Sequence, residues 1–285
     1  MSSTRSHPTR LLPSALLVAA AITAASVATS PAVAEEAPGY RIQPLLENVA
    51  WPWNIAFLPD GGYLLTQRGG KLLRLDADGS IAAEIRGVPP AYVKSQGGLF
   101  DVLLDPDFAD NGRIYLSYAH GVPEANATRV MAARLDDDAL RDHEVLFTVE
   151  PTKDTPVHYG GKLALMNDGT LLLTTGDGFD YRQAAQRLDS LIGKTIRIHT
   201  DGSIPDDNPF VDDPDALDAI WTWGHRNPQG LAVTPDGDVW QHEHGARGGD
   251  ELNLLVAGGN YGWPVATTGS TTTAPASRRT PNIRA

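Results

Sequence analysis

The sequence predicts an all-β protein built from a repeated unit of antiparallel strands, as in a β-propeller. Short apolar runs alternate with turns, and long helical patterns are absent. An Asp-Gly or Asn-Gly turn also recurs, with its glycine at Gly61, Gly112, Gly169 and Gly237, at spacings of 51, 57 and 68 residues. Strands that repeat at such intervals are typical of propeller blades. A two-sheet sandwich is the alternative architecture.

Each repeat is predicted to contain a hairpin. Asn-Gly and Asp-Gly favour type I′ turns, which need positive φ at both central residues. The hairpin segments cover residues 54–79, 101–119, 161–178 and 230–245. The segment "RQAAQRLDSLIGK" at 182–194 is predicted to hold one short helix inside an insertion.

The first 34 residues are predicted to be a secretory signal peptide. Arg5 and Arg10 precede a long apolar run, and "AVA" at 32–34 fits a cleavage site. A membrane anchor is the alternative, but the Ala- and Ser-rich run with its cleavage site favours export. We therefore expect a secreted or periplasmic protein without stable membrane insertion.

The repeats stop before the C-terminus. Residues 35–264 are expected to form a partial propeller with about four blades, whereas 265–285 lack strand alternation and are rich in Thr, Ala and Ser. Such a tail is predicted to be disordered. Because a propeller closes on itself or leaves sheet edges exposed, we expect a chain truncated at its C-terminus, with a frameshift near Thr267 as one explanation.

Composition restricts the function. The net charge of -12 disfavours nucleic-acid binding, while it is compatible with calcium. The absence of cysteine excludes disulfides, thiolate zinc sites and a cysteine nucleophile. The sequence contains no serine elbow, phosphate-binding loop or dinucleotide motif, so acyl transfer and nucleotide chemistry have no support.

Polar residues recur at Gly-rich strand boundaries. Gln96 lies in "SQGGLFD", His158 in "PVHYGGKL", Asp177 in "TTGDG", and Arg226 and Asn227 in "GHRNPQG". Each alone is compatible with an ordinary turn residue. Their parallel placement predicts convergence at one end of the propeller axis.

These side chains suit one kind of chemistry. A neutral His158 can accept a proton from an alcohol, and the Asp177 carboxylate can orient the ring. The Arg226 fork suits a ligand carboxylate, and Asn227 adds a donor and an acceptor. A base beside an anion clamp indicates an anionic cofactor and an alcohol substrate.

The segment "HEHGARGGDELNLL" at 242–255 is a second polar cluster. His242 and His244 share one side of a strand, which would permit zinc, but no third ligand has fitting spacing. The glycines expose carbonyls, and Asp250 and Glu251 supply carboxylates, so calcium is the better match. An acidic turn is the alternative.

Together the motifs resemble the soluble PQQ-dependent aldose sugar dehydrogenases of the glucose/sorbosone dehydrogenase family. The resemblance rests on six motifs that occur in the order of that family. They are "HYGGKL", "GDG", "GKTIRIHTDGSIPDDNPF", "GHRNPQGLA", "EHGARGGDELNLL" and "GGNYGWP". The likeness covers residues 40–264. It implies a six-bladed propeller that oxidises the anomeric hydroxyl of an aldose to a lactone, with pyrroloquinoline quinone (PQQ) and calcium as cofactors and an external electron acceptor.

The resemblance also implies roles for single residues. His158 matches the general base and Asp177 the carboxylate that supports it. Gln96 matches a polar residue near cofactor and substrate, and Arg226 and Asn227 match residues that hold the cofactor. The metal positions follow: Gly245 and Ala246 match backbone carbonyl ligands of the cofactor's calcium, and Glu251 and Tyr261 match ligands of a second, structural calcium. The family usually has proline where Ala246 stands.

The largest departure lies after Pro264, where the family's remaining cofactor-binding lysine and arginines have no counterpart. We therefore expect weak or absent PQQ binding by the chain as written. Two other functions remain open at this stage: a lactonase-type calcium propeller, and a secreted propeller that only binds carbohydrate or protein. The sugar and the oligomeric state are not readable from the sequence.

Overall fold

The computed structural model describes residues 43–267. The predicted signal peptide and residues 268–285 of the predicted tail lie outside the described residues. The helices within 43–267 are short: α1 (Phe108–Asn111) and a 3-10 helix (Arg182–Gln186). The second lies inside the segment for which a short helix is predicted. None of the helices in this part of the chain is long and apolar enough to cross a membrane.

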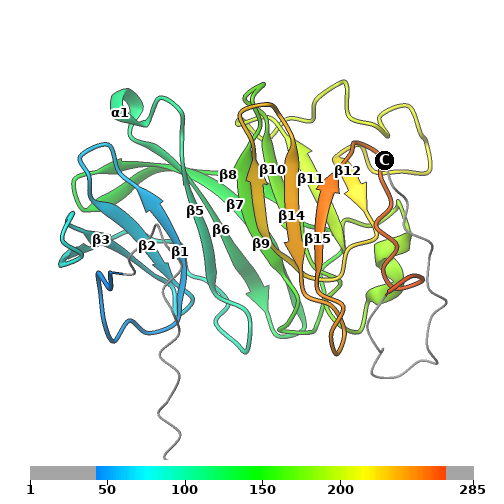
Figure 1. The fold of residues 1–285 in the computed structure, drawn as a ribbon, viewed down its shortest axis with the longest axis horizontal. Coiled ribbons are helices and arrows are strands. Elements are labelled where there is room, and N and C mark those ends of the chain that lie inside the picture. The colour runs from blue at the N-terminus through cyan, green and yellow to red at the C-terminus, as the bar shows by residue number, and fades with distance from the viewer. Residues whose placement is uncertain (1–42, 268–285) are drawn as a thin grey trace, which may run out of the picture. The chain divides into compact units, whose positions relative to one another are not determined.

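The strands form four antiparallel sheets in chain order, here called blades 1 to 4 (Figure 1). Blade 1 contains β1 (Pro52–Phe57), β2 (Tyr63–Gln67), β3 (Lys71–Leu75) and β4 (Ile81–Glu84). Blade 2 contains β5 (Leu99–Leu104), β6 (Arg113–Val122), β7 (Ala125–Asp136) and β8 (Ala139–Thr148). Blade 3 contains β9 (Gly160–Leu165), β10 (Leu171–Thr175), β11 (Lys194–Ile198) and β12 (Ile220–Trp223). Blade 4 contains β13 (Pro228–Val233), β14 (Val239–Glu243) and β15 (Glu251–Leu255).

The first strand of each blade packs on the first strand of the blade before it. β5 contacts β1 and β2, β9 contacts β5 and β6, and β13 contacts β9 and β10. Successive sheets therefore meet at their first strands, which is the relation of inner strands in a propeller. The predicted all-β fold with about four blades is confirmed.

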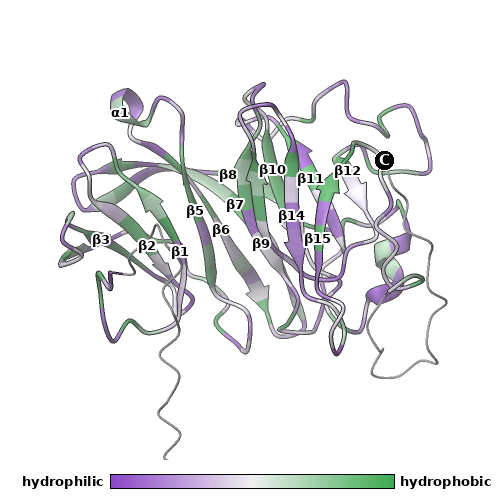
Figure 2. Ribbon diagram, viewed as in Figure 1, coloured by the Kyte–Doolittle hydropathy of each residue, from purple (hydrophilic) through white to green (hydrophobic). Residues whose placement is uncertain are grey.

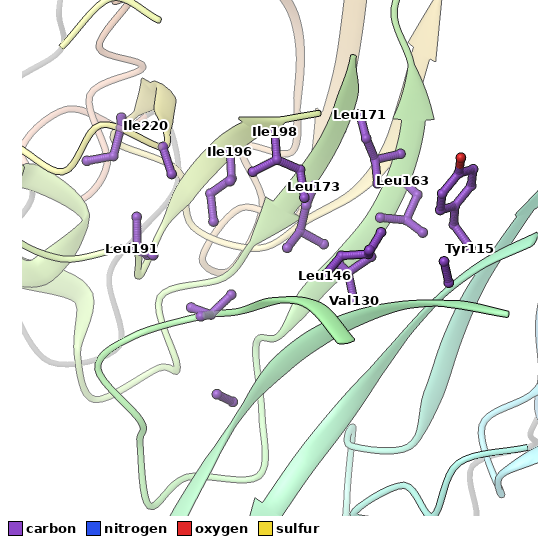
Figure 3. Packing of buried hydrophobic residues seen from close by; sticks show 14 residues of the cluster. Tyr115, Val130, Leu146, Leu163, Leu171, Leu173, Leu191, Ile196, Ile198 and Ile220 are labelled. Carbon is purple, nitrogen blue, oxygen red and sulfur yellow. The ribbon is translucent and has the colours of Figure 1, made fainter. Parts of the chain in front are cut away.

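The apolar core lies between adjacent blades. One cluster joins blades 1 and 2, a second joins blades 2 and 3, and a third joins blades 3 and 4. In the second cluster, Tyr115, Val130 and Leu146 of blade 2 pack with side chains of blade 3 (Figure 3). The blade 3 strands β9 and β10 are correspondingly apolar over most of their length (Figure 2). Because β10 is covered on both faces, its sequence is a continuous run of buried residues and does not alternate.

The recurring turn joins the first and second strands of blades 1, 3 and 4, whereas Gly112 of blade 2 ends α1, and the predicted turn type is wrong. Leu58 N donates to Gly62 O at 2.9 Å, and Gly61 N donates to Leu58 O at 3.0 Å. These bonds close a three-residue loop in which only Gly61 has positive φ, the pattern of a type I turn followed by a left-handed glycine. Asp60, the other central residue of a type I′ turn at Asp-Gly, does not have positive φ, so the three-residue loop leaves the left-handed conformation to glycine alone.

Candidate functional site

The predicted site residues flank the open ends of the blade hairpins. His158 precedes β9 and Asp177 follows β10, and these strands are antiparallel partners. Asn227 precedes β13 in the same way, and His244, which follows β14, donates its N–H to Asn227 O at 3.2 Å. An antiparallel pair places the start of its first strand beside the end of its second. The same end of each hairpin therefore presents the polar residues, as the sequence predicts.

His158 and Asp177 form a buried pair. Nδ1 of His158 lies 2.6 Å from Oδ1 of Asp177, and the two residues are 6% and 1% exposed. A carboxylate at Nδ1 holds the proton there, so Nε2 carries the free lone pair of the neutral ring. Nε2 has no hydrogen-bond partner among residues 43–267. In that part of the chain Asp101 Oδ1 is the one buried side-chain polar atom without a hydrogen-bond partner, so Nε2 is not completely buried. This arrangement presents a proton acceptor to an incoming group.

The backbone of His158 is held in an unusual conformation. Its φ is 48°, a left-handed value that a residue with a side chain adopts only when its surroundings enforce it. His158 N donates to Gln96 Oε1 at 2.8 Å. A Cβ on Gly176 would lie 2.3 Å from His158 O, so only glycine permits this close approach. The first glycine of "TTGDG", Gly176, is therefore required by packing against His158.

Asp177 is fixed by three further hydrogen bonds. Oδ1 accepts the Phe179 N–H at 2.7 Å, and Oδ2 accepts the indole N–H of Trp263 at 2.7 Å. The Asp177 N–H donates to Arg226 O at 2.8 Å. The ring of Phe179 also meets the His158 ring edge-on at 5.5 Å. The carboxylate therefore has one orientation, which in turn orients the imidazole.

Asn227 and Arg226 connect blade 4 to this pair. Asn227 Oδ1 accepts the Gly160 N–H at 3.2 Å, which leaves its amide nitrogen without a partner among residues 43–267. Arg226 Nη1 donates to His244 O at 3.0 Å, and the guanidinium lies 5.4 Å from the Trp263 ring centre. Burial lowers the pKa of Arg226, while the carboxylates of Asp177 and Glu243 act against that shift. An arginine remains charged under such conditions.

A cavity of about 310 Å³ opens at this end of the blades. It is lined by residues of blade 1, of the loop before blade 2, and of blade 4. They are Trp51, Pro52, Trp53, Arg68, Gln96, Asn227, Gln229 and His244. Arg68 supplies positive charge, and its guanidinium lies 4.1 Å from the ring centre of Trp51. The cavity thus combines amide donors with a cationic wall, which suits a polar anionic ligand.

The predicted calcium loop follows β14. Gly245 N donates to Asp250 Oδ1 at 2.7 Å. A Cβ on Gly245 would lie 2.3 Å from the carbonyl oxygens of both Gly248 and Gly249, so these oxygens converge on its Cα. Ala246 is buried against Ala185 and Trp263. Convergent carbonyls without a side chain between them are the donor type that calcium accepts.

The side chains of Glu251 and Tyr261 lie at opposite ends of β15. Glu251 begins the strand, whereas the Tyr261 hydroxyl donates to Leu254 O at 2.8 Å near its end. Burial, with Glu243 on the neighbouring strand, raises the pKa of Glu251 to about 7. Their carboxylate and hydroxyl do not converge, so a shared metal would use backbone oxygen from Tyr261. In the described part of the chain no three His, Cys, Asp or Glu side chains form a metal-binding group, so His242 and His244 have no third partner of this kind.

Two further polar residues of this region, Lys153 and His225, were not predicted as site residues from the sequence. Lys153 is buried beside the pair, where its Nζ donates to Asn126 Oδ1 at 3.1 Å and lies 3.4 Å from the ring centre of Tyr159. Burial lowers the pKa of Lys153 to about 7, although Asp177 and Asp154 oppose the shift. His225 is fully buried and bonds Glu243 through Nδ1 at 2.9 Å. Neither residue follows a local pattern that marks it, because its burial depends on other blades and loops.

The chain is similar to proteins of known type. The family model described as Glucose / Sorbosone dehydrogenase matches residues 49–283. "Aldose sugar dehydrogenase YliI" of Escherichia coli is 43% identical over 233 residues, which is 80% of this chain and 62% of the relative. "Quinoprotein glucose dehydrogenase B" of Acinetobacter calcoaceticus is 32% identical over 250 residues, 77% of this chain and 51% of the relative. The chain thus spans between half and two thirds of the length of these curated relatives.

Solved structures give the same result. The apo-form of the soluble aldose sugar dehydrogenase of Escherichia coli superposes with a TM-score of 0.75 at 42% identity, over 79% of this chain and 66% of that one. The PQQ-bound form of the aldose sugar dehydrogenase of Streptomyces coelicolor superposes with a TM-score of 0.70 at 30% identity, over 78% and 65%. The likeness to both structures covers about four fifths of this chain.

Proposed function

Since the chain belongs to the glucose/sorbosone dehydrogenase family, we propose that it is a PQQ-dependent sugar dehydrogenase that oxidises the anomeric hydroxyl of aldoses to lactones. The observation that carries this proposal is the buried His158–Asp177 pair, whose 2.6 Å contact leaves the imidazole Nε2 free. The names of the relatives support the substrate class, since they are aldose sugar and glucose dehydrogenases.

His158 acts as the general base in this proposal. Its Nε2 takes the proton of the anomeric hydroxyl, and the Asp177 carboxylate stabilises the imidazolium that forms. Because Asp177 is buried and held by three donors, it stays in place while the ring changes charge. Gln96 fixes the backbone of His158 and also lines the cavity, so it connects base and ligand positions.

The residues of the cavity fit PQQ, a planar tricarboxylate. Asn227 and Gln96, which line the cavity, would hold it together with Arg226, the residue before Asn227, and Arg68 would supply a further cation from the cavity wall. The cofactor would supply the acceptor for the hydride that leaves the anomeric carbon. The free amide nitrogen of Asn227 is the donor most directly available, because its oxygen is already bound to Gly160 N.

Calcium is proposed as the second cofactor. The carbonyls of Gly245 and Ala246 would bind the ion beside PQQ, and the carbonyls gathered around Gly245 support a loop built from oxygen donors. Glu251 and Tyr261 are proposed for a separate structural calcium. The charge of a divalent ion would offset the repulsion between Glu251 and Glu243, which lie directly opposite each other on β15 and β14.

We further propose that the protein works outside the cytoplasm with an external electron acceptor. The predicted signal peptide at residues 1–34 is the reason for the location. Aldoses outside the inner membrane would be accessible to it without transport.

The test is dye-linked oxidation of aldoses by the purified mature chain, with PQQ and calcium added together, singly and not at all. Because weak PQQ binding is expected, PQQ is added in large excess, and activity that needs both cofactors would support the proposal. The product distinguishes other functions, because a lactonase would consume lactone without reducing the dye. Absence of dye reduction on a panel of aldoses, with the chain folded and both cofactors present, would contradict the proposal for this chain.

A further inference from the structure

Trp263 contacts both parts of the candidate site at once. Its indole N–H donates to Asp177 Oδ2 at 2.7 Å, and the face of its ring lies 5.4 Å from the guanidinium of Arg226. The residue is 6% exposed and comes from the segment "GGNYGWP", 86 residues after Asp177. Trp263 therefore reaches the His158–Asp177 pair from the end of blade 4.

The two oxygens of Asp177 are not equally supported. Oδ1 has His158 Nδ1 and the Phe179 N–H, whereas Trp263 is the one hydrogen-bond partner of Oδ2 within residues 43–267. Asp177 is 1% exposed, so water has little access to replace a lost donor. An unsatisfied buried carboxylate oxygen is unfavourable, and the carboxylate would rotate to find another partner.

Trp263 is itself held from both sides. The backbone N–H of Trp263 donates to Gly224 O at 2.9 Å, and Gln186 Nε2 donates to the Trp263 carbonyl at 2.7 Å. Its ring packs with Ala185 and Ala246. The indole thus has a fixed backbone and a fixed ring plane, which are the requirements for a donor that positions another group.

We propose that Trp263 is a positioning residue whose indole N–H fixes the Asp177 carboxylate and thereby the Nδ1–H tautomer of His158. The neutral side chain of a free histidine in water prefers the proton on Nε2. The contact with Asp177 must therefore overcome that preference to leave Nε2 unprotonated. Losing the donor at Oδ2 lets the carboxylate turn, weakens its bond to Nδ1, and shifts the ring toward the Nε2–H form. This proposal rests on the proposed function, because it treats His158 as the base.

The test compares W263F with W223F in the full chain. Trp223 is the matched control, because it is also an indole donor, to Gly258 O at 3.2 Å, and it does not contact the pair. Long-range ¹⁵N–¹H correlation of the His158 ring, at a pH where it is neutral, measures the ratio of the two tautomers. We expect W263F to raise the Nε2–H fraction about fivefold, the equivalent of one hydrogen bond of about 1 kcal/mol, and W223F to leave it unchanged.

A second measurement needs no variant. In the unmodified chain, the indole N–H of Trp263 should exchange with solvent at least about tenfold more slowly than that of Trp51, which is 66% exposed. An unchanged tautomer ratio in folded W263F would overturn the proposal. If W263F does not fold, fast exchange of the Trp263 indole would overturn it instead. Neither readout uses sugar or PQQ, so failure of the dehydrogenase assay with a shifted tautomer would refute the proposed function and leave this inference standing.

Discussion

Nδ1 of His158 lies 2.6 Å from Oδ1 of Asp177 because the two residues flank the same hairpin. His158 enters β9 and Asp177 leaves β10, so strand pairing brings together groups that are 19 residues apart. The pair needs no long-range contact to form, but its orientation depends on Gln96 from the loop before blade 2 and on Trp263 from the end of blade 4. The His158–Asp177 pair and the contacts that orient it can therefore be tested separately.

Replacing the base tests its role directly. In H158Q the side chain can no longer accept a proton, so kcat of the dye-linked reaction should fall by about 10² to 10⁴-fold. The substitution H143Q is the control, because His143 is exposed on β8 and is not among the residues of the candidate site. Steady-state kinetics with PQQ and calcium measure both. Equal rates for H158Q and the parent chain would rule His158 out as the base.

Replacing the arginine tests the anion clamp. R226Q keeps a donor for His244 O but removes the positive charge, so PQQ should bind at least about tenfold more weakly, as expected for one charged hydrogen bond. R141Q, at an exposed position of β8, should bind as the parent chain does. Titration followed by calorimetry measures the Kd. A clamp made by other residues would leave R226Q unaffected.

Replacing Lys194 tests how much a buried lysine outside the candidate site stabilises the fold. Its Nζ donates to Ala184 O at 2.9 Å, Ala185 O at 3.1 Å and Ile192 O at 2.8 Å, and it is fully buried. K194M removes the donor of Ile192 O and one of the two donors of Ala184 O and of Ala185 O, so the free energy of unfolding should fall by about 2 to 4 kcal/mol.

Urea unfolding measures the effect of K194M. K71M is the control, because the Lys71–Glu84 bridge is about half exposed and should contribute less than about 1 kcal/mol. A K194M variant as stable as the parent chain would show that the lost hydrogen bonds of Lys194 do not stabilise the fold.

The same lysine makes stability depend on pH. Burial lowers the pKa of Lys194 and of Lys153 to about 7, from an ordinary value of 10.5. Between these values the unfolded chain binds more protons than the folded chain, so stability should rise with pH, by at most about 1.4 kcal/mol per unit for each lysine. Above pH 10 the trend should reverse, because burial raises the pKa of Tyr115 to about 12 and only the unfolded tyrosine ionises.

Urea unfolding of the parent chain and K194M between pH 7 and pH 10 separates this contribution. The slope of the free energy of unfolding against pH should be smaller in K194M. An identical slope would mean that Lys194 keeps its proton in the folded chain.

The interface between blades 2 and 3 should tolerate truncation poorly. Leu173 of β10 is fully buried in that cluster (Figure 3), so L173A should cost about 2 to 5 kcal/mol. Leu252 is 69% exposed on β15, and L252A should change stability by less than about 1 kcal/mol. Thermal and urea unfolding of both variants provide the comparison. A small loss for L173A would mean that the cluster closes around the lost side chain.

Local sequence predicted the repeats and much of the site. The positions of Gly61, Gly169 and Gly237 mark the same turn in three blades, because an L-residue avoids the left-handed φ that each adopts. The predicted turn type was wrong, because Gly61 alone adopts positive φ and Asp60 does not. Gln96, His158, Asp177, Arg226 and Asn227 were predicted to converge, and hydrogen bonds between the blades join them in the structure.

What the sequence by itself determined is the alternation of strands and turns, and the placement of polar groups at one end of each hairpin, because both follow from contacts between near neighbours. Only the tertiary structure decided that Trp263 meets Asp177, that the amines of Lys153 and Lys194 are buried, and that the Tyr261 hydroxyl donates to Leu254 O of β15. These relations depend on how blades and loops distant in the chain pack together. Burial and desolvation, which set the charge and orientation of such groups, arise from that packing and have no signature within a short stretch of sequence.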